Sequence, residues 1–145
     1  GTTLRNVFVT LFAHRVTLEG MLLKTGLVLY GKECPQPASV ETVATATLRC
    51  LDDVVPPAVP GVVFLSGGQS DVAATERLNA ICRLDDAPWK LTFSFGRALQ
   101  DAALKAWQGR PANVSMAQSA LHHRAACNSL AVQGKYSGEA ETAAA

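Results

Sequence analysis

Apolar side chains along this chain fall into short runs and into longer stretches with helical spacing. Three runs, at residues 18–23, 61–66 and 89–95, predict strands. The second run is continuously apolar, as in a parallel strand covered on both faces, whereas the third alternates apolar and polar residues. Helical stretches separate the three runs. This alternation predicts a parallel sheet with right-handed crossover connections.

Helices are predicted around and between the strands, at residues 4–13, 40–51, 71–84, 97–107 and 115–132. Ser39 has the position of a helix N-cap, and Gly134 that of a helix stop. Ser115 and Gln118 fit a capping box at the start of the last helix. The core side of the helix at 71–84 is expected to consist of Val72, Leu78, Ile81 and Cys82.

The chain has 145 residues, a usual length for one domain. A parallel sheet of three strands leaves two edges unpaired, and a closed eight-stranded α/β barrel needs about 250 residues. We therefore predict an α/β fold over residues 1–134: a partial (β/α)8 TIM barrel, roughly its last three βα units plus a C-terminal helix. Residues 135–145 are expected to form a flexible tail, because no large apolar group occurs after Tyr136. On this interpretation the chain begins inside a larger fold.

Composition excludes several classes of partner. The charged residues are dispersed and the formal net charge is +1, so neither nucleic acid nor a membrane is expected as a partner. No apolar run approaches the ~20 residues needed to span a bilayer. The four cysteines are widely spaced and include no C-x-x-C pair. We therefore expect reduced thiols in a cytoplasmic protein rather than a disulfide framework or a zinc site.

Lys24 is the first candidate for chemistry, because it ends the apolar run of the first predicted strand. Burial there would lower the pKa of the amine, since desolvation disfavours the ammonium form. A neutral lysine amine is a nucleophile that attacks carbonyl carbons and forms Schiff bases. The alternative is a lysine whose stem packs in the core while its charged end reaches water.

Two glycine-containing loops follow the second and third predicted strands. In residues 66–70 (SGGQS) the glycines let backbone N–H groups approach an anion at the start of a helix. In residues 94–97 (SFGR), Gly96 leaves room for a ligand and Arg97 can bind phosphate with two hydrogen bonds. The alternatives are a tight turn for the first loop and, for Arg97, a surface ion pair with Asp101.

The position of these loops points to one kind of substrate. In α/β barrels the active site lies at the carboxyl ends of the strands, and phosphate often binds the loops after the last two strands. Lys24 together with both loops therefore predicts a phosphorylated carbonyl compound as the substrate. The histidines predict no metal site, because His122 and His123 are adjacent in a helix and His14 stands apart. We expect all three to be surface residues.

Beyond these motifs, the chain closely resembles the class I fructose-bisphosphate aldolases over nearly its whole length. The matching segments run in family order and are residues 18–24 (LEGMLLK), 55–59 (VPPAV), 64–70 (FLSGGQS), 78–81 (LNAI), 89–100 (WKLTFSFGRALQ), 103–107 (ALKAW) and 128–130 (NSL). The resemblance implies a (β/α)8 barrel that cleaves fructose 1,6-bisphosphate to dihydroxyacetone phosphate and glyceraldehyde 3-phosphate in glycolysis. It also implies a cytoplasmic homo-oligomer, usually a tetramer, that requires no metal or other cofactor.

The resemblance also implies roles for individual residues. Lys24 matches the lysine that forms the Schiff base. The residues that match the binding site of the phosphorylated sugar are Ser66, Gly67, Gly68, Ser94, Gly96 and Arg97.

Departures from the family pattern leave a second interpretation open. The family's acid–base residues lie upstream of the position that matches Gly1, and its C-terminal tyrosine has no match before Ala145. Residues 25–27 (TGL) replace the family's usual Pro-Asn-Met beside the lysine. We therefore expect the isolated chain to be weakly active or inactive. The alternative function is that of a truncated, non-catalytic aldolase remnant that at most binds sugar phosphate or a protein partner.

Overall fold

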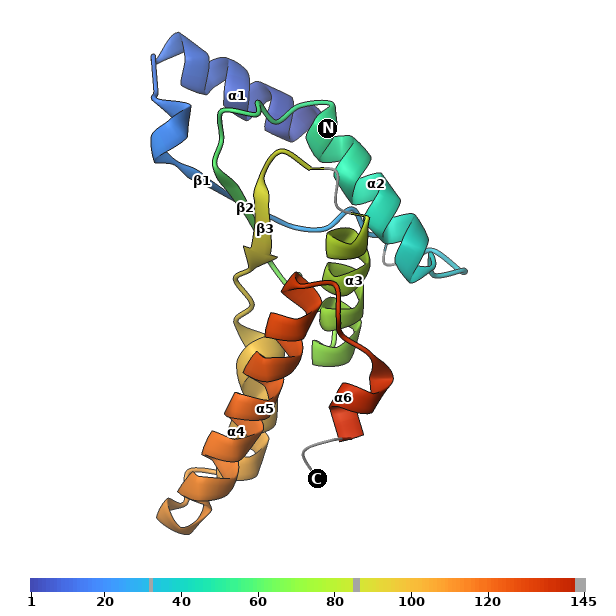
Figure 1. The fold of residues 1–145 in the computed structure, drawn as a ribbon, viewed down its shortest axis with the longest axis vertical. Helices are drawn as coiled ribbons and strands as arrows, with labels where there is room; N and C mark the ends of the chain where they lie inside the picture. The colour runs from blue at the N-terminus through green and yellow to red at the C-terminus, as the bar shows by residue number, and fades with distance from the viewer. Residues whose placement is uncertain (32, 85–86, 143–145) are drawn as a thin grey trace.

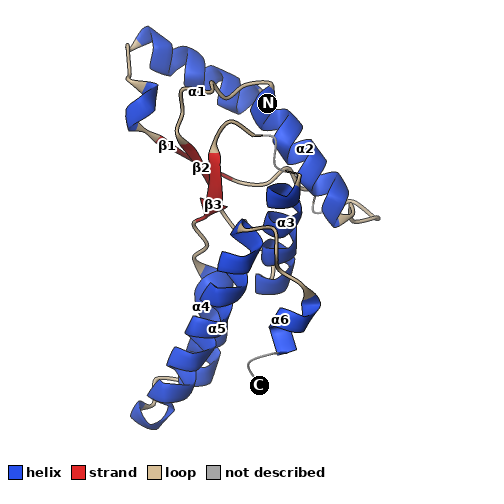
Figure 2. Ribbon diagram, in the orientation of Figure 1, coloured by secondary structure: helices blue, strands red, loops and turns tan. Residues whose placement is uncertain are grey.

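The computed structural model describes residues 1–31, 33–84 and 87–142. Helices and strands alternate along the chain, as Figures 1 and 2 show. The elements are α1 (Thr2–Ala13), η1 (Leu18–Gly20), β1 (Leu22–Thr25), α2 (Val40–Asp52), β2 (Gly61–Phe64), α3 (Asp71–Arg83), β3 (Lys90–Phe93), α4 (Arg97–Trp107), η2 (Pro111–Asn113), α5 (Val114–Val132) and α6 (Gly138–Thr142). The strands form one parallel sheet in the order β1–β2–β3, which confirms the predicted α/β alternation and parallel pairing.

One face of the sheet is covered and the other is open. A buried row crosses the three strands and consists of Leu23, Val62 and Leu91. The neighbouring row consists of Leu22, Gly61 and Lys90. In this second row the Leu22 side chain is 62% exposed. Successive residues of a strand point to opposite faces, so the buried row faces the helices and the Leu22 row faces outward.

Local capping signals explain two helix ends and fail at a third. The Ser39 Oγ accepts a hydrogen bond from the backbone N–H of Thr42 at 3.1 Å and caps α2, as predicted. Gly134 follows α5 with a φ of +68°, the left-handed conformation expected of a helix stop. The predicted capping box is wrong, because α5 begins at Val114, directly after the 3-10 turn η2. Ser115 therefore already lies inside the helix.

The strands are shorter than predicted. Residues 18–20 form the 3-10 turn η1, and β1 begins only at Leu22. Leu18 is nevertheless buried, so its apolar side chain reflects core packing rather than a strand. β2 and β3 also stop before their predicted ends. In α3 the expectation for Val72 is wrong, because this first-turn residue is exposed, whereas the other predicted core residues are buried or partly buried.

The C-terminal segment has more structure than the expected flexible tail. Tyr136 is buried, and its backbone N–H donates to the side-chain oxygen of Asn79 on α3 at 3.0 Å. The short helix α6 follows, and its Glu141 forms an ion pair with Arg124 on α5. These partners are distant in the sequence, so the polar composition of the segment does not reveal them. Residues 143–145 of the expected tail lie outside the described residues.

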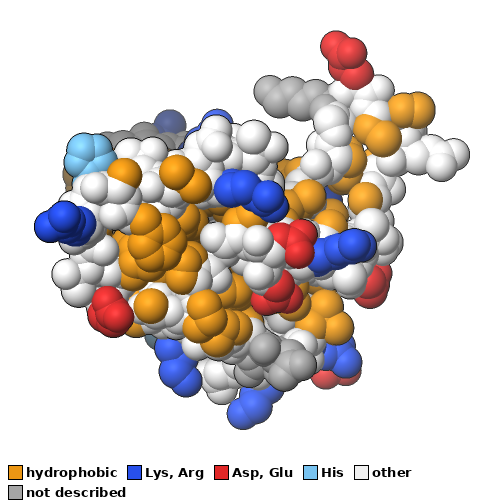
Figure 3. All heavy atoms as spheres, turned by 90° about the horizontal axis from the view of Figure 1, so that it is seen from above, with side chains coloured by type: hydrophobic (Ala, Val, Ile, Leu, Met, Phe, Trp, Pro, Cys, Tyr) orange, Lys and Arg blue, Asp and Glu red, His pale blue; other side chains and the backbone are white. Residues whose placement is uncertain are grey.

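The helices also shape the surface. α4 and α5 pack side by side and form an arm that points away from the sheet (Figure 1). Apolar side chains gather over α1 in the view from above (Figure 3). On this helix, Val9 and Phe12 are 63% and 59% exposed. Across the described residues, none of the helices combines the length and apolar character that a membrane span requires.

Candidate functional site

The predicted site residues come together at one edge of the sheet, because the three strands are parallel and their carboxyl ends coincide. Two backbone hydrogen bonds extend the pairing past the strand ends. The Leu65 N–H donates to the Thr25 carbonyl at 2.8 Å. The Ser94 N–H donates to the Phe64 carbonyl at 2.8 Å as well. These bonds hold the loops after β2 and β3 beside the end of β1, where Lys24 lies.

Lys24 lies within β1 and its side chain is exposed. The expectation of a buried amine is therefore wrong for this structure. β1 is an edge strand, and Lys24 shares the open face of the sheet with Leu22, two residues earlier. In the described part of the chain, no carboxylate forms an ion pair with Lys24. The amine is accordingly accessible to a small molecule that approaches the open face.

The loop after β2 has the backbone geometry of an anion site. Gly67 and Gly68 have φ angles of +61° and +83°, which favour glycine. The backbone N–H and the Nε2 of Gln69 both donate to the Ser66 carbonyl, at 3.1 and 2.7 Å, and close the loop into a turn. Among the described residues, the N–H groups of Gly67 and Gly68 meet no protein acceptor. Both groups are therefore free to donate to a ligand.

The N-terminus of α3 contributes less to this anion site than the sequence indicated. The Ser70 Oγ accepts the Ala73 N–H at 3.2 Å. The Asp71 carboxylate accepts the Val72 N–H at 2.9 Å. These side chains occupy donors that an anion would use, and Asp71 adds negative charge at the same point. The glycine N–H groups, rather than the helix end, are the main donors of the loop.

Arg97 reaches from the loop after β3 toward the loop after β2. It begins α4, and a Cβ atom placed on Gly68 would lie 3.7 Å from the Arg97 Nη2. The alternative ion pair with Asp101 is not observed among the described residues. Gly96 is the N-cap of α4 and offers no side chain to its first-turn N–H groups. The guanidinium and the backbone donors of both loops can therefore bind one phosphate.

The two predicted serines differ in their surroundings. Ser66 is 7% exposed, and its backbone carbonyl accepts a hydrogen bond from the Gln69 side chain. Ser94 is half-buried and is held next to β2 by its backbone hydrogen bond to Phe64. Both serines thus lie at the same sheet edge as Lys24.

An ion-pair network around Arg124 joins α5 to Asp71 at the start of α3 and to Glu141 on α6. No local sequence pattern indicated this network. Arg124 is 3% exposed and donates to the two carboxylate oxygens of Glu141 at 3.0 and 2.5 Å. Its Nη1 also lies 3.9 Å from the Asp71 carboxylate. Burial raises the pKa of Glu141, but the hydrogen bonds and the charge of Arg124 outweigh burial and lower this pKa overall. Burial and the bonded Glu141 carboxylate raise the pKa of Tyr136, whose hydroxyl donates to Glu141.

The histidines separate into two classes. His14 and His122 are exposed, as predicted, whereas His123 is partly buried. The His123 Nε2 lies 3.7 Å from the Cys127 Sγ and 3.8 Å from a carboxylate oxygen of Glu141. The spacing of four residues between His123 and Cys127 is one helical turn, and this spacing is the signal that could have revealed the pair.

Comparisons with known proteins show which family the sequence resembles. The family model described as "Fructose-bisphosphate aldolase class-I" matches residues 1–145. A fructose-bisphosphate aldolase of Dictyostelium discoideum is 50% identical over 139 residues, which are 96% of this chain and 39% of that protein. Fructose-bisphosphate aldolase 2, chloroplastic, of Arabidopsis thaliana is 52% identical over 136 residues, which are 94% of this chain and 34% of that protein. The chain thus spans well under half the length of these curated relatives.

A comparison with solved structures agrees with the sequence comparisons. A solved structure of fructose-bisphosphate aldolase from Plasmodium falciparum, in complex with TRAP and a small-molecule inhibitor, matches this structure with a TM-score of 0.92. The two sequences are 50% identical, and the match covers 94% of this chain and 40% of that chain. The predicted partial (β/α)8 barrel is confirmed. The chain belongs to the class I fructose-bisphosphate aldolase family.

Proposed function

We propose that this chain supplies the Schiff-base lysine and the phosphate-binding loops of a fructose-bisphosphate aldolase. The reaction is the cleavage of fructose 1,6-bisphosphate to dihydroxyacetone phosphate and glyceraldehyde 3-phosphate, and its reversal. One observation carries the proposal: the Lys24 amine and the approach of Arg97 to Gly68 lie at the same sheet edge. An amine beside an anion site is suited to a substrate that carries both a carbonyl and a phosphate.

Lys24 is the nucleophile of the proposed reaction. Its amine attacks the ketone carbon of the substrate, water leaves, and a protonated imine forms. The protonated imine withdraws electrons from the carbon–carbon bond that breaks. The lysine thus provides the electron sink, and the proposal assigns no metal or other cofactor to this step.

The substrate phosphate is proposed to bind between the loops after β2 and β3. The Gly67 and Gly68 N–H groups donate from one side, and the Arg97 guanidinium donates from the other. The proposed binding residues are Ser66, Gly67, Gly68, Ser94, Gly96 and Arg97.

Reductive trapping tests the role of the lysine. Borohydride added with dihydroxyacetone phosphate should convert the imine to a stable adduct, located by mass spectrometry on the peptide that contains Lys24. Lys24→Met should abolish the adduct. Lys90→Met is the matched control, because Lys90 is also exposed and lies on the same face of the sheet. An adduct that persists in Lys24→Met, or that forms equally on Lys90, would refute the assignment.

The phosphate site has its own test. Arg97→Met should raise the dihydroxyacetone phosphate concentration needed for half-maximal trapping by about 10- to 100-fold, since hydrogen bonds to charged groups contribute about 1.5–3 kcal/mol. Arg110→Met removes an exposed arginine elsewhere and should leave this concentration unchanged. Equal effects of the two substitutions would show that Arg97 acts only through net charge.

A second candidate function is that of a non-catalytic aldolase remnant that binds sugar phosphate or a protein partner. The exposure of Lys24 and the lack of an ion-paired carboxylate beside it in the described chain favour this alternative. A cleavage assay with fructose 1,6-bisphosphate separates the candidates. Trapping without turnover would support the remnant, and turnover near that of a complete aldolase would exclude it.

The proposal extends to partners and location. We propose a phosphorylated sugar as the ligand, a homo-oligomer when the barrel is complete, and the cytoplasm as the compartment. The chloroplastic relative from Arabidopsis thaliana shows that the compartment varies within the family. Sedimentation velocity tests the oligomer, and a stable monomer of the complete barrel would contradict it.

A further inference from the structure

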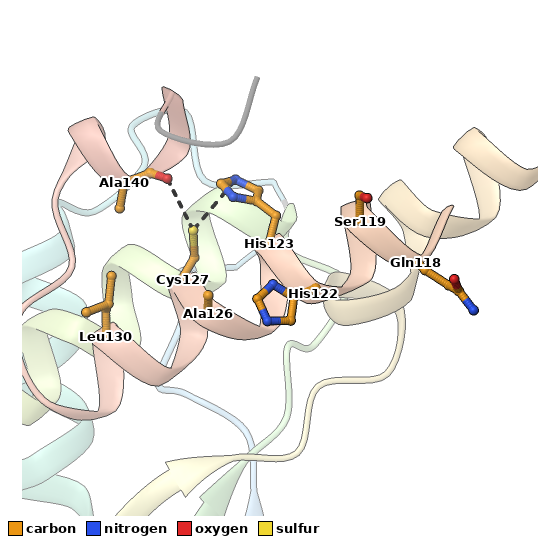
Figure 4. Close-up of a pocket in the computed structure, with 8 residues that line it drawn as sticks. All are labelled: Gln118, Ser119, His122, His123, Ala126, Cys127, Leu130 and Ala140. Atoms are coloured by element: carbon orange, nitrogen blue, oxygen red, sulfur yellow. Dashed lines mark hydrogen bonds between the residues drawn. The ribbon is translucent and has the colours of Figure 1, made fainter. Parts of the chain in front are cut away.

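We propose that His123, Cys127 and Glu141 together bind a divalent transition-metal ion, with Zn²⁺ the best chemical match. His123 and Cys127 lie one turn apart on α5, and Glu141 comes from α6. Figure 4 shows the His123 ring and the Cys127 sulfur turned toward each other on one side of α5. Cysteine spacing predicted no zinc site, because two of the three ligands are not cysteines and one comes from a separate helix.

The ligand atoms lie near the spacing that a metal ion imposes. The His123 Nε2 is 3.7 Å from the Cys127 Sγ and 3.8 Å from the Glu141 Oε2, and all three atoms lie within 4.8 Å of one another. Tetrahedral Zn²⁺ has sulfur at about 2.3 Å and nitrogen or oxygen at about 2.0–2.1 Å, so its ligand atoms are roughly 3.3–3.6 Å apart. Small side-chain rotations would therefore bring the three atoms onto one ion.

The charges around the cluster favour a divalent cation. Arg124 carries one positive charge against the carboxylates of Asp71 and Glu141, which leaves an excess of negative charge. A divalent ion bound to a Cys127 thiolate would bring these groups to neutrality.

Arg124 also fixes the orientation of the metal-binding carboxylate. The Glu141 Oε1 accepts from the Arg124 Nη2 at 2.5 Å and from the Tyr136 hydroxyl. The Glu141 Oε2 accepts from the Arg124 Nη1 at 3.0 Å and also faces His123, so it retains a lone pair for the ion. Groups that hold a ligand by hydrogen bonds in this way are a regular part of metal sites.

The chemistry of the donors selects the metal. A thiolate with an imidazole and one carboxylate suits Zn²⁺ or Co²⁺, whereas Mg²⁺ and Ca²⁺ prefer sites made of oxygen. Without a metal, the Cys127 thiol donates to the Ala140 carbonyl at 3.6 Å, whereas a metal-bound cysteine is a thiolate. Metal binding would release this proton to solvent.

A groove gives an ion access to the cluster. It has a volume of about 610 Å³ and is lined by His123 and Cys127 together with His122 and Leu130 (Figure 4). Water in the groove can occupy the fourth coordination position, which three protein ligands leave open. The site therefore has ligands, charge balance and an entry path.

The test uses the whole chain, with Co²⁺ as a spectroscopic probe. Tetrahedral Co²⁺ bound to a thiolate gives a sulfur-to-metal charge-transfer band and strong visible absorption. We expect the band to saturate at one Co²⁺ per chain and to disappear when Zn²⁺ is added. No band, or a band that Zn²⁺ does not displace, would overturn the proposal without recourse to any variant.

Four variants locate the metal. His123→Ala and Cys127→Ser should weaken Co²⁺ binding by more than about 100-fold, since even groups that only support metal ligands contribute about 10- to 100-fold. His122→Ala, in the same groove, and Cys34→Ser, at an exposed cysteine, should bind Co²⁺ as the unmodified chain does. A band retained in Cys127→Ser, or lost in Cys34→Ser, would place the metal on another thiol and refute the site.

Discussion

Replacing Glu141 with glutamine should loosen the attachment of the C-terminal segment to the rest of the chain. The carboxylate accepts hydrogen bonds from two nitrogens of Arg124, at 3.0 and 2.5 Å, and from the Tyr136 hydroxyl. Glutamine has the same shape but only one acceptor oxygen, and its NH₂ group would face a guanidinium that can only donate. At least one hydrogen bond between charged groups is therefore lost.

The expected cost is about 2 kcal/mol, within the range of about 1.5–3 kcal/mol for a hydrogen bond to a charged group. Arg124 is 3% exposed, so water cannot readily replace the missing acceptor. About 2 kcal/mol corresponds to roughly 30-fold more frequent opening of the segment that contains α6.

Hydrogen exchange of the Tyr136 amide measures this opening, because that N–H donates to Asn79 and is released when the segment detaches. With a metal chelator present, Glu141→Gln should accelerate this exchange by roughly 30-fold. Glu139→Gln is the matched control, since it removes an exposed carboxylate from the same helix. Unchanged exchange in Glu141→Gln, or equal acceleration in Glu139→Gln, would refute the assignment of this role to the ion pair.

Two substitutions test the helix ends by urea unfolding. Ser39→Ala should lower the free energy of unfolding by about 1 kcal/mol because α2 loses its N-cap, whereas Ser119→Ala, at an exposed position in α5, should change it by no more than about 0.5 kcal/mol. Gly134→Ala should cost at least about 1–2 kcal/mol, because its φ is +68° and the new Cβ would lie 2.9 Å from the Arg83 Cγ. Gly138→Ala, where a Cβ meets no atom of the described residues within 4 Å, should be close to neutral. A variant that matches its control would contradict the corresponding argument.

The features that sequence predicted well depend on neighbouring residues. The alternation of apolar runs with helical stretches determined the order of elements, and Ser39 caps its helix through a residue three positions away. Parallel pairing follows from that order, so the meeting of Lys24 with the two glycine loops at one sheet edge could also be predicted.

The features that sequence missed depend on distant residues. The exposure of Lys24 follows from the edge position of β1 and the open face beside it, which an apolar run does not indicate. Arg124 and Glu141 lie on different helices. The sequence around each residue predicts only a charged side chain on the surface. The metal cluster was missed for the same reason, because its third ligand is Glu141.

The sheet register has a kinetic consequence. Gly61 pairs with Leu22 on one side and with Lys90 on the other, and a complete helix separates the partners along the chain in each case. Such pairs close large loops before any contact is gained, so they form slowly, whereas α4 and α5 meet across a short turn. We expect pulsed hydrogen exchange during refolding to protect α4 and α5 before β1, and simultaneous protection would contradict this order. Strand β1, which carries Lys24, would then be among the last parts of the chain to form.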